Sequence, residues 1–115
     1  MYKEKIMKIS KELLKGSTAI MILKIISLED SYGYQITQVL HQKSNDTFML
    51  KEGTLYPILH SLEKEGYVES YRKESDNGRE RKYYHITAKG KIHLSEQIEA
   101  WNIFYQSVNC VLDRD

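Results

Sequence analysis

Basic side chains gather in the second half of this 115-residue chain, between residues 72 and 91. The whole chain has a net charge of only +1, but this stretch holds seven basic residues against three acidic ones, a net charge of +4. The basic residues are Arg72, Lys73, Arg79, Arg81, Lys82, Lys89 and Lys91. Lysine and arginine neutralise phosphates, so a local basic stripe on a neutral chain is typical of a surface that binds nucleic acid. The alternative is an ordinary solvated surface.

Polar and aromatic side chains that could also contact nucleic acid occur between residues 53 and 65. Leucine and isoleucine recur there at helical spacing, as Leu55, Ile58, Leu59 and Leu62. The side chains that fall on the other sides of such a helix are Thr54, Tyr56, Pro57, His60, Ser61 and Lys64. We expect the hydroxyl of Tyr56 to be available to a phosphate or a base edge. The alternative is that its ring packs against the neighbouring strands.

Residues that carry catalysis or bind metals are few and scattered. His41, His60, His85 and His93 have no metal-ligand spacing, and a single cysteine, Cys110, cannot form an intrachain disulfide. The sequence also has no glycine-rich phosphate loop and no nucleophile elbow. It therefore predicts neither an enzyme nor a protein that depends on a cofactor or a metal. For Cys110 we expect a small buried side chain, with a redox role or an intersubunit disulfide as alternatives.

These side chains must be positioned by a mainly helical fold with one hairpin. Apolar spacing predicts helices over about residues 13–28, 33–42, 53–65 and 88–113, and two strands within 67–87. Asp76-Asn77-Gly78 is a strong signal for the turn between the strands. Tyr83 and Tyr84 point to opposite faces of the second strand, so one of them packs on the core.

Several residues indicate where the helices begin. Ser31 or Asp30 can cap the second helix, and Thr87 can cap the last one. Pro57 lacks an N–H group and fits only in or next to the first turn, so the third helix begins near Gly53.

The last helix carries an apolar stripe at alternating spacings of four and three residues. Its members are Leu94, Ile98, Trp101, Tyr105, Val108 and Leu112. Because the helix is too long for a small three-helix core to cover, we expect the stripe to pair with a second copy of the chain. The alternative is packing on the first helix of the same chain.

Trp101 lies near the middle of this stripe. The face of an indole suits a planar or cationic ligand, and Glu99 could balance a positive charge on that ligand. The alternative is that Trp101 is the large anchor of a dimer interface.

The boundary at Thr87 divides the chain into residues 1–87, which hold the helices and the hairpin, and residues 88–115, which form the dimerisation helix. The chain has no apolar run long enough to span a membrane and no signal-peptide core, so we expect a cytoplasmic protein.

The predicted order of three helices and a basic hairpin is that of a winged helix-turn-helix. Motifs in three parts of the chain resemble the PadR family of transcriptional regulators, in that family's order and spacing. They are YGYQI at residues 32–36, EGTLYPIL at 52–59 with LEKEGYV at 62–68, and GRERKYYHIT at 78–87 followed by Gly90. The likeness covers about Leu13 to Leu112, and the single C-terminal helix resembles the short branch of the family.

The resemblance implies a dimeric repressor that binds palindromic operator DNA and releases it when a small molecule or a stress signal arrives. By the same resemblance, Tyr34, Thr54 and Tyr56 would contact DNA from the helix pair. Arg81 and Lys82 would do so from the wing, which is the hairpin predicted within residues 67–87, and the charge of Arg79 suits a phosphate there. Many relatives have a basic residue where Ser61 stands, so that contact is in doubt. The remaining alternative is a winged-helix module that binds another protein.

Overall fold

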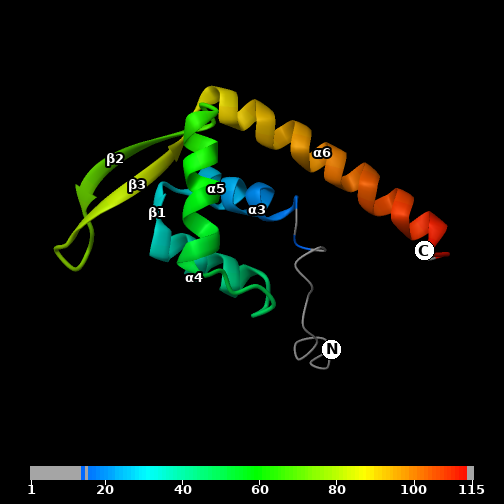
Figure 1. The fold of residues 1–115 in the computed structure, drawn as a ribbon, viewed down its shortest axis with the longest axis horizontal. Helices are drawn as coiled ribbons and strands as arrows, with labels where there is room; N and C mark the ends of the chain where they lie inside the picture. The colour runs from blue at the N-terminus through cyan, green and yellow to red at the C-terminus, as the bar shows by residue number, and fades with distance from the viewer. Residues whose placement is uncertain (1–13, 15, 114–115) are drawn as a thin grey trace.

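The computed structural model describes Leu14 and residues 16–113 of the chain. In chain order the elements are α3 (Thr18–Leu28), β1 (Ser31–Tyr32), α4 (Gly33–Lys43), α5 (Glu52–Lys64), β2 (Val68–Glu74), β3 (Glu80–Ile86) and α6 (Ala88–Val111). Figure 1 shows α3, α4 and α5 gathered together, with the β2–β3 hairpin extending to one side and α6 to the other. The predicted fold class, mainly helical with a small hairpin in winged helix-turn-helix order, is confirmed. No helix among the described residues is long and apolar enough to cross a membrane.

Helix α3 lies at the centre of the hydrophobic core and packs against α4, α6 and β3. Because neighbours cover it on several sides, Ile22, Leu23, Ile25 and Ile26 are all buried, rather than one narrow stripe. The helix begins at Thr18, after Gly16 adopts a left-handed φ of +88° that interrupts the predicted longer helix. Leu13, where we expected it to begin, lies outside the described residues.

The sheet has a third strand that the sequence did not predict. The strand order is β1-β3-β2, and β1 pairs with β3 through Ser31 with Tyr84 and Tyr32 with Tyr83. Strands β2 and β3 pair in the predicted hairpin, from Val68–Ile86 to Glu74–Glu80. Two residues are too few to produce a period-two pattern in the sequence. They nevertheless join the hairpin to the start of α4.

The predicted cap of α4 is wrong. The N-cap is Tyr32, whose backbone N–H donates to Oε1 of Gln35 at 3.2 Å. Ser31 and Asp30 are occupied elsewhere, because the Ser31 hydroxyl donates to the carbonyl of Glu29 and the Asp30 carboxylate accepts hydrogen bonds from the hairpin. Helix α5 begins one residue before the predicted Gly53.

The predicted cap of α6 is confirmed, and it also attaches α6 to the end of α5. Oγ1 of Thr87 accepts from the N–H of Gly90 at 3.0 Å and donates to the carbonyl of Gly66 at 2.7 Å. Nζ of Lys89 donates to the carbonyl of Glu65 at 2.8 Å. The first turn of α6 is therefore held directly against the residues that end α5.

Within the part of the chain that the structure describes, only the first part of α6 packs against other elements. Leu94 is buried and Ile98 packs against the same core, so the alternative of packing within one chain holds for these two residues. Farther along, Trp101 is 41% exposed, Tyr105 56% and Leu112 60%. Cys110 is exposed as well, so the predicted burial of its side chain is wrong for the single chain.

Candidate nucleic-acid interface

The start of α4, the outer side of α5 and strand β3 line one open cleft of about 240 Å³. Four of the six residues predicted to bind DNA lie along it: Tyr34, Tyr56, Arg81 and Lys82. Residues separated by almost fifty positions in the sequence thus share one surface. Glu52 and Glu80 also line the cleft, and sequence reasoning did not single them out.

Tyr34 and Tyr56 give the cleft two exposed aromatic side chains. Tyr34 is 63% exposed at the start of α4, and Tyr56 is 45% exposed on α5. Burial of Leu55, Leu59 and Leu62 turns the other side of α5 outward, as the spacing predicted. The ring of Tyr56 lies against Gly33, with its hydroxyl end closest to the glycine.

Arg81 and Lys82 extend from opposite faces of β3, because neighbouring residues of a strand alternate in direction. The guanidinium of Arg81 lies over the ring of Tyr32, 5.0 Å from its centroid, and Nε of Arg81 is buried with no hydrogen-bond partner among the described residues. Nζ of Lys82 lies 3.8 Å from Oε1 of Glu63 on α5. These contacts hold two cations beside the cleft from both sides of the wing.

Thr54 and Arg79 are exposed but do not line this cleft. Thr54 lies in the first turn of α5, and Arg79 follows the hairpin turn. Oδ1 of Asn77 accepts from the N–H of Arg79 at 3.1 Å, and Gly78 has a φ of +85°. The predicted Asp-Asn-Gly turn is therefore present, and it places Arg79 at the tip of the wing.

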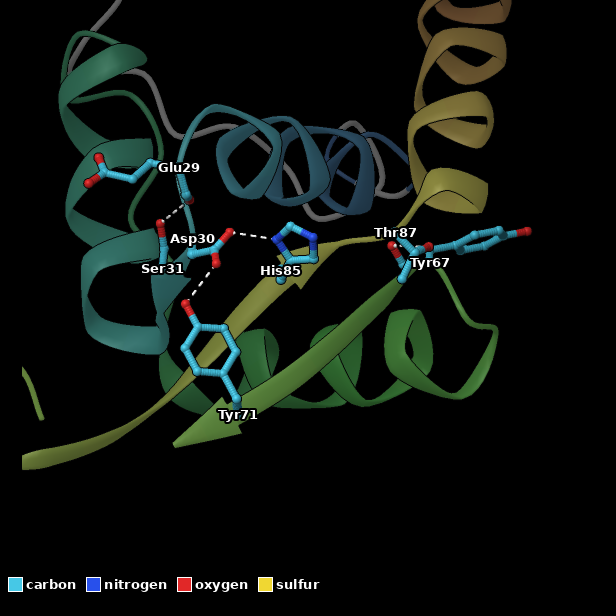
Figure 2. Close-up of polar contacts among 7 residues, drawn as sticks. All are labelled: Glu29, Asp30, Ser31, Tyr67, Tyr71, His85 and Thr87. Carbon is cyan, nitrogen blue, oxygen red and sulfur yellow. Dashed lines mark hydrogen bonds and ion pairs between the residues drawn. The ribbon is translucent and has the colours of Figure 1, made fainter. Parts of the chain in front are cut away.

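Sequence reasoning missed a polar cluster on the face of the wing that lies away from α5. The Tyr71 hydroxyl donates to Oδ2 of Asp30 at 2.7 Å, and Nδ1 of His85 lies 2.9 Å from Oδ1 of the same carboxylate. Figure 2 shows both side chains converging on Asp30 from β2 and β3. No spacing rule could have found this cluster, because the partners of Asp30 are 41 and 55 residues away.

Hydrogen bonding changes the pKa values of this cluster. Partial burial raises the pKa of Asp30, but hydrogen bonds from Tyr71 and His85 outweigh it, so that the pKa lies below its usual value. The bond to Asp30 raises the pKa of Tyr71 to about 12. Near neutral pH, the cluster is therefore an ionised carboxylate held by a protonated tyrosine and a histidine.

The two residues predicted to bind a ligand lie on α6, away from this cleft. The ring of Trp101 is flanked by Phe104, with centroids 5.9 Å apart, and by Tyr105, at 6.3 Å. Glu99 is exposed two positions earlier, which on a helix is about 200° around the axis. A single chain therefore does not present Trp101 and Glu99 to the same side.

Three helices, a basic wing and a polar cleft beside the third helix define a winged helix-turn-helix protein. The chain belongs to the PadR-like family of transcriptional regulators, whose family model matches residues 22–96. This is a family of regulators, so the prediction that the protein is not an enzyme is confirmed.

Similar proteins are known in several bacteria. The chain is 32% identical over 90 residues to transcriptional regulator Rv3488 of Mycobacterium tuberculosis, covering 78% of this chain and 80% of the relative. A PadR-like transcriptional regulator of Bacillus cereus has 40% identity and a TM-score of 0.78, over 91% of this chain and all of the other. A transcriptional regulator of Clostridium thermocellum has 34% identity and a TM-score of 0.80, over 88% and 95%.

Proposed function

We propose that this protein represses nearby genes as a homodimer bound to a palindromic operator. Helix α5 enters the major groove and the wing follows the phosphates. The observation that carries the proposal is the cleft in which Tyr34 and Tyr56 lie beside Arg81 and Lys82. Tyrosine hydroxyls can bond phosphates or base edges, and the two cations neutralise phosphates. Thr54 and Arg79 extend this surface at the start of α5 and at the wing tip.

Pairing of two chains through α6 is the second part of the proposal. Beyond Ile98, the described part of the chain leaves a broad apolar side of this helix exposed. It comprises Trp101, Phe104, Tyr105, Val108, Val111 and Leu112. Closed two-fold dimers are the most common way to bury such a surface. Residues 1–87 then act as the DNA-binding part and residues 88–115 as the dimerisation helix.

The third part concerns release from DNA. A planar aromatic or cationic molecule stacks on Trp101 between the paired helices, and Glu99 of the opposite chain can then supply the negative charge. Such a ligand releases DNA only if it binds the DNA-incompetent arrangement of the dimer more tightly. A regulator must reach its DNA, so the expected cytoplasmic location belongs to the same proposal.

Fluorescence anisotropy with a labelled duplex from just upstream of the protein's own gene tests DNA binding. A scrambled duplex is the control, and both are measured between 50 and 200 mM salt. We expect preference for the native duplex and loss of about three orders of magnitude in affinity over this range, as for six or more phosphate contacts. Binding to neither duplex by a verified dimer would instead favour a module that binds protein.

Two lysine variants make the test residue-specific. Lys82→Ala removes a cation from the cleft, whereas Lys24→Ala removes one from an exposed position on α3. For a dimer, losing Lys82 should lower the salt slope by about two, because each phosphate contact contributes about 0.9. Lys24→Ala should leave the slope unchanged. Equal slopes for the two variants would exclude Lys82 from the interface.

A further inference from the structure

Asp30 lies where α3 ends and β1 begins, and its carboxylate binds both strands of the wing. Oδ2 accepts from Tyr71 on β2, and Oδ1 lies 2.9 Å from Nδ1 of His85 on β3 (Figure 2). Among the described strands, β1 pairs with β3 alone, and β3 separates it from β2. The Tyr71–Asp30 hydrogen bond therefore joins the far strand directly to the segment that leads into α4.

The same face of the wing is packed by aromatic rings that support this connection. Tyr83 stacks on Tyr71 with centroids 5.8 Å apart and meets the edge of Tyr32 at 5.3 Å. Nζ of Lys73 lies 4.7 Å from the centroid of Tyr83. The guanidinium of Arg81 lies over the ring of Tyr32, and Arg81 also lines the cleft. The position of Arg81 thus depends on contacts made on the face of the wing opposite α5, whereas Lys82 is held by Glu63 of α5.

We propose that Asp30 is a positioning residue for DNA binding, which holds the wing at the angle that places Arg81 and Lys82 beside Tyr34 and Tyr56. The inference rests on the proposed function, since it assumes that this cleft meets DNA. Asp30 itself does not line the cleft. It acts through the wing, and its lowered pKa keeps the acceptor ionised throughout the neutral range.

Whether removal of Asp30 weakens or strengthens DNA binding distinguishes a positioning role from a purely electrostatic one. Removing a negative charge from a DNA-binding protein should strengthen its attraction to phosphates. Loss of the positioning contact should weaken binding instead. Glu29 is a matched control because it is the adjacent residue, it is exposed, and Figure 2 shows its side chain pointing away from the cluster.

The experiment compares the parent, Asp30→Ala, Tyr71→Phe and Glu29→Gln on the upstream duplex. We expect Asp30→Ala to weaken binding roughly tenfold and Tyr71→Phe roughly fivefold, the scale of one or two hydrogen bonds. Glu29→Gln should bind as tightly as the parent or more tightly. Chemical denaturation verifies that every variant is folded under the binding conditions.

A second readout distinguishes a moved wing from a slightly less stable protein. In Asp30→Ala the salt slope should fall by about two to four, as two wings lose phosphate contacts. Amide exchange should accelerate at Ser31 and Tyr84, which pair where β1 meets β3. If the parent binds DNA and Asp30→Ala binds with unchanged affinity and slope, the positioning role is excluded. If the parent itself does not bind, the proposed function fails.

Discussion

Gly33 at the start of α4 lies against the hydroxyl end of Tyr56 on α5, so closely that a Cβ at position 33 would overlap that hydroxyl. The contact explains why a buried position in the first turn of a helix holds a glycine, although the residue costs helix stability. It also means that the position of Tyr56, a half-exposed residue of the cleft, depends on the absence of a side chain on the preceding helix.

Gly33→Ala should therefore displace Tyr56 more than it disturbs the fold. The atoms that an added Cβ meets belong to the far end of a half-exposed side chain, which can rotate away. We expect DNA affinity to fall roughly tenfold, while the free energy of unfolding changes by less than about 1 kcal/mol. A double-mutant cycle with Tyr56→Ala, measured by anisotropy, checks the cause. If Gly33→Ala weakens binding just as much without the Tyr56 ring, the two effects are independent and this explanation is wrong.

Gly90→Ala should destabilise the fold itself. A Cβ there would meet the backbone carbonyl of Tyr67 and Cγ1 of Ile86, and neither group can move aside easily. We expect unfolding to become easier by about 3 kcal/mol in urea denaturation, at the upper end of overpacking costs.

Gly53→Ala is the matched control, because a Cβ on that helical glycine meets nothing within 4 Å. Alanine should there increase the free energy of unfolding by about 0.5 kcal/mol or more. Similar effects of the two substitutions would contradict the packing described for Gly90.

Trp101→Glu should convert the proposed dimer into monomers, because a charge cannot be buried in the apolar stripe without a large desolvation cost. Ile103→Glu makes the same change at a 60% exposed residue, about 200° around the helix from Trp101. Light scattering after size-exclusion chromatography should find that only the Ile103 variant remains dimeric. Two dimeric variants would show that α6 pairs through another side or not at all.

The contribution of Tyr71 to stability should depend on pH at both ends of the range. Its pKa is raised from 10 to about 12, so its stabilisation is complete below pH 10 and is lost as pH rises toward 12. Asp30 has a lowered pKa, so its part is complete above about pH 3.8 and is lost as pH falls below that value. The difference in unfolding free energy between the parent and Tyr71→Phe should follow this profile.

Ultraviolet absorbance of tyrosinate gives a direct check of the same cluster. The difference between the titrations of the parent and Tyr71→Phe isolates Tyr71, and in Asp30→Ala its midpoint should return toward 10. A midpoint near 10 in the parent would mean that the hydrogen bond to Asp30 does not persist in solution.

Sequence reasoning predicted the elements well where local patterns determine them. The outward side of α5 follows from the burial of Leu55, Leu59 and Leu62, and the cap of α6 follows from the hydroxyl of Thr87. The strand β1 and the Asp30 cluster depend instead on contacts with β2 and β3, far along the chain. The sequence offers no local signal for such contacts. Glu99 and Trp101 show a different limit of sequence reasoning. They are two positions apart in the sequence, but on one helix this spacing places them on different sides.

The attachment of α6 to the end of α5 has a mechanical consequence. With 24 residues, α6 is an arm about 36 Å long, and Thr87 and Lys89 at its near end bond to the carbonyls of Gly66 and Glu65, which directly follow α5. The first part of α6 also packs against α3 and β3, so a change in the angle of this arm acts on α5 and on the neighbouring elements together. If the proposed function holds, the exposed half of α6 is the place where a second chain, or a molecule bound between two chains, would change the tilt of α5 relative to DNA.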